Sequence, residues 1–416
     1  MVGDKIRDLR KKLGLTQEQL AGHELTKSYV SQVELGRIRP SRKALKIMAD
    51  RLGKPLGYFL DNDDDLRTVD VLLKASEALW SSGRLEEAAV GLREARLLAE
   101  RMGRDDILAK IQATSGQLEL SRGHYAAAEQ LLKDALGALH VSESPVQVVE
   151  TASALGRATS HAGRFHDAVA YFHQSVDVAR TLTDHQQVAA MALETFGDFC
   201  AGLEQWVSAK DLYDEARRLA GTDPKRAVEL DLRRIRAGIA LGHLEEAGIL
   251  MTNTQPRLGG LPHSGLRARL SLDAAESCLK LKRWEDADGL VQESLSYFQD
   301  HPADPSDVAL ALQLGLQSAR QAHNPVWGRR YQELALAAPD SAMLNPVKAD
   351  AYRLRATYAA TAHDALHDLA AAVQHDPDNA ALALEYQVMA AKSGQPGALE
   401  DLWNLVRSDK IQVPLS

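Results

Sequence analysis

The chain has 416 residues, of which 45% are hydrophobic and 25% are charged, a composition typical of folded rather than disordered proteins. It contains no apolar run of the roughly 18 residues that a membrane span requires, and its first residues lack the apolar segment of a secretion signal. Its two cysteines, Cys200 and Cys278, are too few for a disulfide framework. We therefore expect a cytoplasmic protein with no membrane partner, and both cysteines in its core.

Charge is distributed unevenly along the sequence. Residues 1–60 contain 13 Lys and Arg against 6 Asp and Glu, a net charge of +7. Residues 61–416 contain 36 basic and 51 acidic residues, a net charge of −15. A basic head on an acidic body indicates that only the head meets a polyanion such as double-stranded DNA.

The head begins with two short helices, each bounded by recognisable signals. The first is predicted over 6–13, with Gly14 as its left-handed cap. The second is predicted over 17–21, because Thr16 and Gln19 have the spacing of a capping box.

Two further helices complete the head. Thr26 and Gly36 bound a third helix over 27–35, and Ser41 begins a fourth over 42–52 that leads into the sequence GKPLGYFL. The apolar residues of these helices are expected to form one small core, which consists of Ile6, Leu9, Leu13, Leu20, Val30, Val33, Leu45, Ile47 or Met48, and Leu52.

These motifs resemble the lambda-repressor-like (XRE) helix-turn-helix. The stretches LTQEQLA, SYVSQVELG, RPS and GKPLGYFL occur in the order found in that family, and the resemblance covers about residues 4–60. One departure is the turn in AGHELTKSYVS, which is one residue shorter than the usual form with glycine in this turn. The resemblance implies a DNA-binding head and leaves open the angle at which the third helix enters the groove.

The N-terminal part of the third helix should face base edges in the major groove. Glutamine can bond adenine in two places and lysine can donate to guanine, so side chains of these types can read sequence there. The predicted base-facing residues are Lys27, Ser28 and Gln32, flanked by Tyr29 and Ser31 at a phosphate or a thymine methyl. The predicted phosphate contacts are Gln17, which matches such a position in the family, and Arg37, Arg39, Arg42 and Lys43.

Arg10 and Glu34 match a structural ion pair of the family that joins the first and third helices. We assign this pair to stability rather than to recognition of DNA. The alternative interpretation of the head is a small helical domain whose basic residues form a solvated face.

The body repeats a two-helix pattern every 40 residues. Gly83, Gly123 and Gly163 each lie between two amphipathic helices, and apolar residues follow each glycine at fixed spacings. These followers are Ala88, Ala128 and Ala168, and then Leu92, Leu132 and Phe172. Weaker copies continue to about residue 410, and the last helix is expected in PGALEDLWNLV.

This spacing resembles tetratricopeptide repeats. The resemblance implies a right-handed α-solenoid of about nine helix pairs, so the predicted fold class is all-α. The predicted domains are the head over 1–60, an acidic linker over 61–65, and a solenoid over 66–416 that binds ligand and dimerises. Within the solenoid, residues 255–265 (QPRLGGLPHSG) are predicted to be either a hinge or a longer turn.

A solenoid of this kind presents a concave surface lined by the first helix of each pair. The position after the central small residue of each repeat gives a polar column suited to hold an extended peptide. The column consists of Gln117, Arg157, Asp198, Arg236, Glu276 and Gln317. The alternative is that these charges pair with one another between adjacent repeats.

No motif for catalysis or nucleotide binding is present, so neither an enzyme nor a cofactor is predicted. His363 and His367 are four residues apart and share a helical face, a spacing that can place two ligands on a metal. Because no third ligand is implied nearby, exposed histidines on an alanine-rich helix are the preferred interpretation, and no metal is predicted.

A helix-turn-helix followed by a long tetratricopeptide array resembles the RRNPP group of bacterial quorum-sensing regulators. The resemblance implies a cytoplasmic homodimer that binds a paired DNA site, with a short signalling peptide in the groove that alters head spacing or DNA affinity. Two alternatives stay open. In one the array is an adaptor that docks a protein segment, and in the other it is a scaffold whose head only targets it weakly to DNA.

Overall fold

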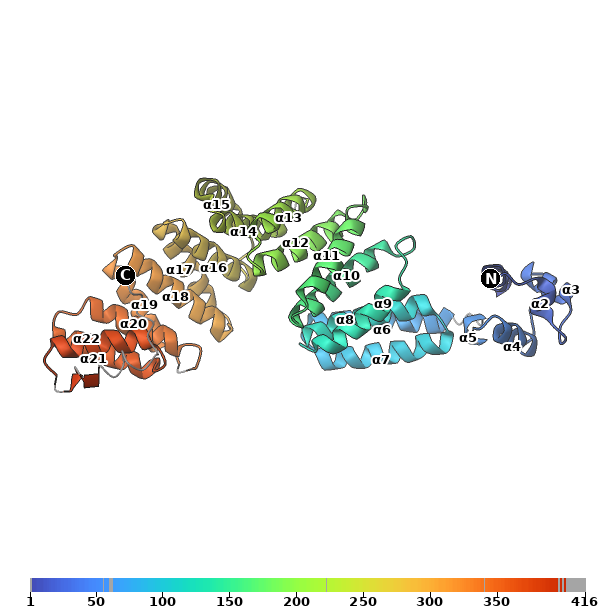
Figure 1. Ribbon diagram of the computed structural model, residues 1–416, viewed down its shortest axis with the longest axis horizontal. Helices are drawn as coiled ribbons and strands as arrows, with labels where there is room; N and C mark the ends of the chain where they lie inside the picture. The colour runs from blue at the N-terminus through green and yellow to red at the C-terminus, as the bar shows by residue number, and fades with distance from the viewer. Residues whose placement is uncertain are drawn as a thin grey trace. The chain divides into compact units, whose positions relative to one another are not determined.

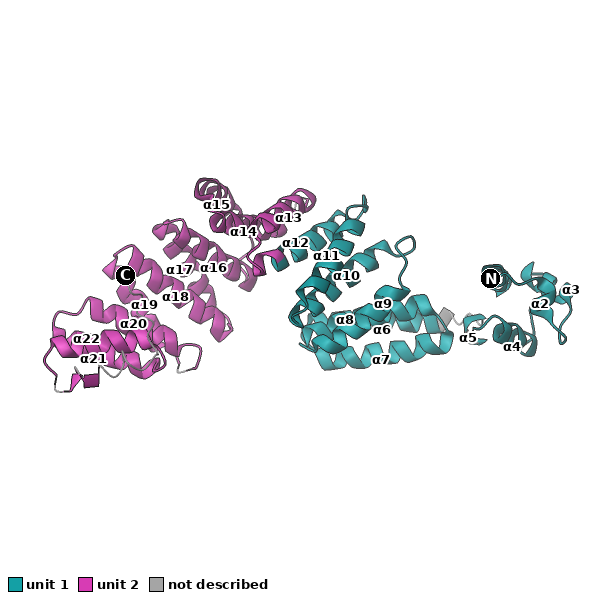
Figure 2. Ribbon diagram, viewed as in Figure 1, with its two compact units in different colours: residues 1–199 teal, residues 200–416 magenta. Residues whose placement is uncertain are grey.

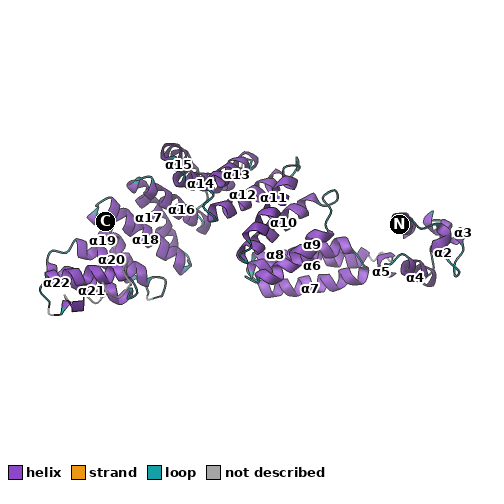
Figure 3. Cartoon of the chain, viewed as in Figure 1, coloured by secondary structure: helices purple, strands orange, loops and turns teal. Residues whose placement is uncertain are grey.

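The computed structural model describes residues 2–54, 56–59, 63–221, 223–339, 341–395, 397–398 and 400–401. Within these residues all regular secondary structure is helical (Figure 3). None of the helices in this part of the chain combines the length and the apolar character needed to cross a bilayer. The chain divides into two compact units, Met1–Phe199 and Cys200–Ser416 (Figure 2). The predicted all-α class is therefore confirmed.

The helices are labelled in chain order (Figure 1). The head contains α1 (Val2–Lys12), α2 (Gln17–Ala21), α3 (Lys27–Glu34), α4 (Arg42–Arg51) and α5 (Leu56–Phe59). The rest of the first unit contains α6 (Asp63–Ser81), α7 (Leu85–Met102), α8 (Asp105–Ser121), α9 (Tyr125–Ala138), α10 (Pro145–His161), α11 (Phe165–Ala179) and most of α12 (Gln186–Gly202). The second unit contains α13 (Trp206–Leu219), α14 (Pro224–Ala240), α15 (Leu244–Gly259), α16 (Gly265–Lys280), α17 (Trp284–Asp300), α18 (Pro305–Gln321), α19 (Pro325–Ala337), α20 (Asn345–Thr357), α21 (Ala362–His375) and α22 (Ala380–Lys392).

The head has a hydrophobic core of its own, close to the predicted one. Its buried residues are Ile6, Leu20, Ala21, Val30, Val33, Leu45, Met48, Ala49, Leu52 and Phe59. The prediction of Leu13 as a core residue is wrong: its side chain is 51% exposed, because α1 ends at Lys12 and Leu13 already belongs to the following turn. Of the two alternatives in α4, Met48 is the fully buried residue.

The segment predicted as an acidic linker over 61–65 is partly helical. α6 begins at Asp63, three residues before the predicted start of the solenoid, and residues 61–62 lie outside the described residues. The acidic run therefore supplies the first turn of a helix, where negative charge is favoured by the helix dipole.

The array consists of successive helix pairs joined by short turns. Within the described residues, the seventeen helices α6–α22 make eight such pairs and the first helix of a ninth. A first helix such as α8 packs against its own partner, α9, and against α10, the first helix of the next pair. Most of PGALEDLWNLV, residues 396–406, lies outside the described residues.

The turn between paired helices requires one residue with a left-handed backbone. Gly83, Gly123 and Gly163 occupy it with φ of +80°, +77° and +77°. In later pairs Glu204, Lys282 and His323 occupy the same place with φ of 58°, 60° and 50°. Gly242 retains the glycine between α14 and α15, with φ of +78°, whereas these three pairs have kept the turn without it, at a conformational cost of about 1 kcal/mol or more per residue.

First and second helices approach each other closely at a glycine on the first helix. A Cβ atom placed on Gly116 would lie 2.6 Å from Leu132, and one on Gly156 would lie 2.8 Å from the ring of Phe172. The same relation recurs in the second unit, where Gly315 faces the buried ring of Tyr331. The large residue of the second helix therefore fills the space that the missing side chain leaves.

The segment over 255–265 is not a hinge along its whole length. α15 continues to Gly259 and includes Pro256, so only residues 260–264 connect it to α16. The side chain of Gln255 accepts a hydrogen bond of 2.8 Å from Arg283, and Leu258 is buried. The structure therefore agrees with a turn rather than a hinge.

Gly156→Ala is expected to lower the free energy of unfolding by about 1–3 kcal/mol, because the added methyl group must displace the ring of Phe172. Gly289→Ala in α17 is the matched control, since a Cβ there meets nothing within 4 Å. The control is expected to be stabilising by up to about 1 kcal/mol, because alanine favours helix more than glycine. Urea unfolding of both variants, followed by circular dichroism, measures the difference. Equal shifts for the two variants would contradict the proposed contact.

Candidate functional site

α3 presents the residues predicted to read bases. Its N-cap Thr26 accepts a 3.2 Å hydrogen bond from the backbone of Tyr29, which starts the helix at Lys27. Val30 and Val33 point into the head core. The remaining surface of the helix carries Lys27 and Ser28, both exposed, and the half-buried Ser31 and Gln32. This surface is free to enter a groove of DNA.

Tyr29 has a second, structural contact. Its hydroxyl accepts a hydrogen bond of 3.4 Å from the backbone nitrogen of Ser41, the N-cap of α4. Its half-buried ring also packs against the head core. Tyr29 therefore connects α3 to the start of α4, and only its exposed edge remains for the predicted DNA contact.

The predicted ion pair between Arg10 and Glu34 is confirmed, and it includes Gln17. Arg10 Nε lies 2.6 Å from Glu34 Oε1, and a second guanidinium nitrogen lies 2.9 Å from Oε2. Gln17 Nε2 donates to the same Oε2 at 2.8 Å, and Arg10 also donates to the carbonyl of Leu15 at 2.8 Å. This cluster joins α1, α2 and α3 behind the surface that would face DNA.

Burial of Glu34 opposes its ionisation, because only 4% of the residue is exposed. The hydrogen bonds from Arg10 and Gln17 outweigh burial and hold the pKa of Glu34 below its usual value. The side chain of Gln17, predicted to contact phosphate, is thus already bonded to a carboxylate within the head.

Arg37, Arg39, Arg42 and Lys43 surround the end of α3 and the start of α4, and all four are exposed. Arg42 and Lys43 occupy the first turn of α4, where no acidic residue is present. Cations are unfavourable at this end of a helix because the dipole is positive there. A bound phosphate would relieve that repulsion, which supports the predicted phosphate contacts.

The shortened turn between α2 and α3 is held by an arginine of α4 to which the sequence alone assigned no role. Arg51, from α4, donates to the carbonyl of Leu20 at 3.0 Å and to that of Ala21, and it forms an ion pair with Glu24. Gly22 has φ of +55°, and a Cβ there would collide with the guanidinium group. Arg51 thus bonds the last carbonyls of α2 and holds the turn that orients α3.

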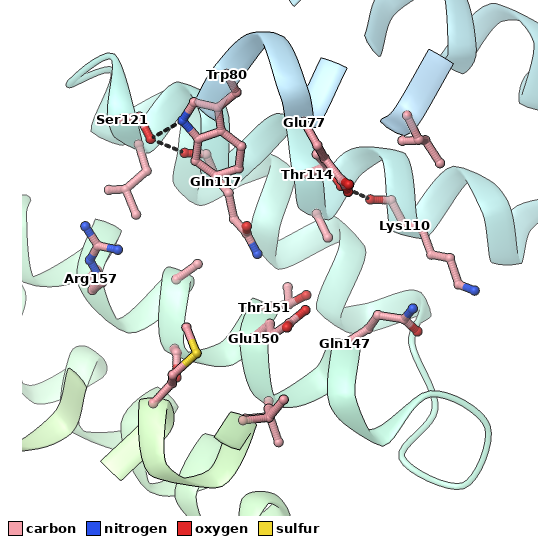
Figure 4. Close-up of a pocket in the computed structure, with 18 of the residues that line it drawn as sticks. Glu77, Trp80, Lys110, Thr114, Gln117, Ser121, Gln147, Glu150, Thr151 and Arg157 are labelled. Atoms are coloured by element: carbon pink, nitrogen blue, oxygen red, sulfur yellow. Dashed lines mark hydrogen bonds between the residues drawn. The ribbon is translucent and has the colours of Figure 1, made fainter. Parts of the chain in front are cut away.

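The second candidate site is a pocket of about 650 Å³ in the first unit (Figure 4). It is lined by α6, α8, α10 and α12, which are the first helices of four successive pairs. Trp80 lies at one edge, where its indole nitrogen donates to Ser121 at 3.1 Å. Apolar lining comes from residues such as Leu73 and Met191. The pocket therefore combines apolar walls with polar groups from several helices.

Charged side chains enter this pocket from different helices. Figure 4 shows Glu77 of α6 and Glu150 of α10 on opposite walls, with Arg157 toward one end and Lys110 toward the other. Desolvation in the hollow, together with the charge of Glu77, raises the pKa of Glu150. The surroundings therefore disfavour the negative charge of Glu150.

The structure places only part of the predicted polar column at this pocket. Gln117 and Arg157 line it, whereas Asp198, on α12, is not among its lining residues. The second unit holds Arg236, 3.4 Å from Asp273 of the next first helix, and Glu276, 2.8 Å from Lys280. It also holds Gln317, which is exposed on α18. Arg236 is therefore paired between adjacent repeats, as the alternative supposed, but with a residue outside the column, whereas Glu276 is paired within its own helix.

The remaining groups to consider are the histidines of α21 and the two cysteines. Asp368, beside His367, accepts hydrogen bonds of 2.5 and 3.0 Å from Arg355. Among the residues described, no three potential ligands are grouped closely enough for a metal ion. Cys200 and Cys278 are buried, and burial raises the pKa of their thiols to about 11 and about 12. These thiols are therefore protonated core residues.

Residues 6–59 match the protein family described as Helix-turn-helix. The head is a helix-turn-helix DNA-binding domain. The matched segment contains α3 and all of the residues predicted to face DNA, and it ends at the last residue of α5. The repeat array that follows the domain is of the tetratricopeptide-like kind, as its helix pairs show.

No curated protein matches the chain by sequence. Among solved structures, PlcR of Bacillus thuringiensis in complex with the peptide PapR7 and DNA is 16% identical, covering 72% of this chain and 94% of that chain with a TM-score of 0.38. The apo form of RapI is 12% identical, covering 78% and 98% with a TM-score of 0.43. A tetratricopeptide repeat protein of Parabacteroides merdae is 12% identical, covering 68% and 99% with a TM-score of 0.44.

Glu34→Gln is expected to destabilise the head near neutral pH by about 1–3 kcal/mol, because it weakens the bonds to Arg10 and Gln17. A carboxylate with a lowered folded pKa contributes stability above its unfolded pKa and loses it as pH falls through the folded value. The difference between wild type and variant should therefore shrink on acidification below the ordinary value of 4.5.

Hydrogen exchange of α1 and α3, read by mass spectrometry at neutral and acidic pH, measures this difference. The matched control is Glu18→Gln, which removes an exposed carboxylate from α2. A gap between wild type and Glu34→Gln that is constant with pH would show that the charge of Glu34 contributes nothing.

Proposed function

We propose that this protein is a sequence-specific transcriptional regulator whose repeat array senses a short signalling peptide. The observation that carries the proposal is the presence, in one chain, of a helix-turn-helix domain and a pocket lined by four successive first helices. The peptide binds in that pocket and changes the affinity of the head for DNA or the spacing between the two heads of a homodimer.

The charge and exposure of the head support sequence-specific DNA binding. Lys27, Ser28 and Gln32 supply donors and acceptors suited to base edges, and the exposed arginines after α3 supply phosphate contacts. The net charge of the head, +7, draws it to DNA, whereas the acidic body is repelled.

The pocket supports binding of a peptide by its contents and its size. Ligand pockets commonly measure about 300–1,000 Å³, so this one accommodates a few residues. Gln117 and Arg157 place an amide and a guanidinium group at its wall, and neither side chain forms an ion pair or side-chain hydrogen bond within the described residues. Both can therefore bond the backbone or the carboxylate of a peptide without breaking an existing contact.

A solenoid transmits such binding mechanically. Each first helix packs against its neighbours, so a ligand that contacts four of them favours one set of inter-repeat angles. Two half-sites on DNA lie about one helical turn, roughly 34–36 Å, apart, so a modest change in head spacing alters affinity strongly.

Substitutions in the head should separate base reading from phosphate binding. Gln32→Ala is expected to relax preference at one base pair, with a loss of about 1–3 kcal/mol at the preferred base. Arg37→Ala is expected to weaken binding to all sequences and to reduce the salt dependence by about one phosphate contact. Selection of sites from random duplex DNA by the full chain, followed by salt titration, measures both effects. Identical behaviour of the two variants would refute the assigned recognition surface.

Arg157→Ala is expected to reduce peptide capture by about tenfold while leaving DNA affinity nearly unchanged, since the residue lies in the pocket. The probe is a randomised library of short peptides, captured by immobilised full-length protein and sequenced by mass spectrometry. The matched control is Arg93→Ala, which removes an exposed arginine from α7. Capture of folded proteins instead of peptides would favour the adaptor, and equal loss of DNA and peptide binding would indicate misfolding.

A further inference from the structure

The pocket contains two carboxylates whose negative charge is not neutralised. Within the described residues, neither Glu77 nor Glu150 forms a salt bridge or a side-chain hydrogen bond. Lys74, one turn before Glu77, is already bonded to Asp70 at 2.7 Å. Desolvation, and then the charge of Glu77, disfavour the ionised form of Glu150, so a positive group bound beside it would favour that form.

Three cations line the pocket: Lys74, which is bonded to Asp70 and also interacts with the charge of Glu77, and Arg157 and Lys110. Figure 4 shows Arg157 and Lys110 toward opposite ends, with Glu77 and Glu150 between them. Neither cation forms an ion pair in the part of the chain that the structure describes. Arg157 and Lys110 thus lie on either side of the two carboxylates, and a ligand that carries both a cation and carboxylates can bond both kinds of group.

A buried hydroxyl beside Glu150 also lacks a partner. Thr151 is 1% exposed and lines the pocket, and its Oγ1 has no hydrogen-bond partner. Figure 4 shows it next to Glu150. A threonine hydroxyl in a helix ordinarily bonds a carbonyl one turn earlier, and an unsatisfied buried hydroxyl is rare. Ser76 and Ser271 also have buried hydroxyls without a partner, and of these three residues Thr151 is the one that lines the pocket.

We propose that the pocket selects peptides carrying a positive charge, with an ammonium or guanidinium group seated between Glu77 and Glu150 and donating also to Thr151. The inference rests on the proposed function and specifies its ligand class. The positive charge comes from either a free amino terminus or a lysine or arginine side chain, which share this chemistry. Arg157 and Lys110 bind carboxylates of the same peptide and repel its cation from the ends of the pocket.

The test uses the full-length protein and two randomised hexapeptide libraries, one with free amino termini and one acetylated. Each library is divided into a pool with lysine and arginine and a pool without them. Captured peptides are quantified by mass spectrometry for the wild type, Glu77→Gln, Glu150→Gln and the double variant. The control is Glu94→Gln, which removes an exposed carboxylate from α7, outside the pocket.

Cationic pools are expected to be enriched at least about tenfold over the acetylated pool without lysine or arginine, since hydrogen bonds to charged groups are the strong ones. The double variant should lose this enrichment, and Glu94→Gln should retain it. Enrichment of the free-amine pool without lysine or arginine identifies the amino terminus as the source of the positive charge. Enrichment of the acetylated pool with lysine and arginine identifies a side chain.

Glu150→Lys provides a second readout that does not depend on loss of binding. It should invert the preference toward acidic peptides, and circular dichroism establishes that the variant is folded. Peptide capture without charge preference, or with a preference unaffected by the double variant, would overturn this inference and leave the proposed function standing. Failure to capture any peptide would overturn both.

Discussion

The fold of the array depends on the close approach of two antiparallel helices at a residue with no side chain or a very small one. Gly156 against Phe172 shows the requirement most clearly, because the ring occupies the volume that any Cβ would take. The alanines at the start of the second helices, such as Ala88 and Ala128, are completely buried for the same reason. Since the second helix of each pair also packs against the first helix of the next, the close approach within a pair contributes to the spacing of the pocket walls.

The turn between paired helices tolerates more residue types than the close contact between the helices does. Glu204, Lys282 and His323 adopt the left-handed conformation that glycine adopts in the first three pairs. Their strain is offset by the packing on either side, where Ala209 and Ala287 are fully buried. A search for repeats that requires glycine at this turn misses these pairs, whereas a search that requires the buried alanine of the second helix finds them.

Much of the fold follows from local signals in the sequence. Thr16, Thr26 and Ser41 each cap a helix as their positions predict, because a capping bond joins residues only a few positions apart. Interactions between distant residues were not predictable in the same way. Arg51 reaches a turn some thirty residues earlier in the chain, and nothing in its neighbourhood marks it as the partner of Gly22.

The residues of the candidate pocket likewise divide into those that a local sequence pattern predicts and those that meet only in the folded chain. The periodic column correctly brought Gln117 and Arg157 to one surface, since periodicity determines which face of a first helix a residue occupies. It did not find Glu77 and Glu150, which lie at other positions of their helices and meet only through the stacking of separate pairs. Arg236 and Asp273 also meet only because separate pairs stack. Arg236 was predicted to bind the peptide, and it instead forms an ion pair between two repeats.

Buried acidic side chains elsewhere in the molecule are bonded by basic or amide groups, unlike Glu150. Asp231 is 1% exposed and is bonded by Arg217, Arg234 and Arg257 from three helices. Glu34 is bonded by an arginine and a glutamine, and these bonds lower its pKa.

Glu150 experiences desolvation too, yet it faces another carboxylate and its pKa is raised. Unlike Asp231 and Glu34, both Glu77 and Glu150 are exposed, so their carboxylates stay accessible to solvent and to a ligand in the pocket. Uncompensated charge beside an unsatisfied hydroxyl is typical of a place where the missing partner is a ligand.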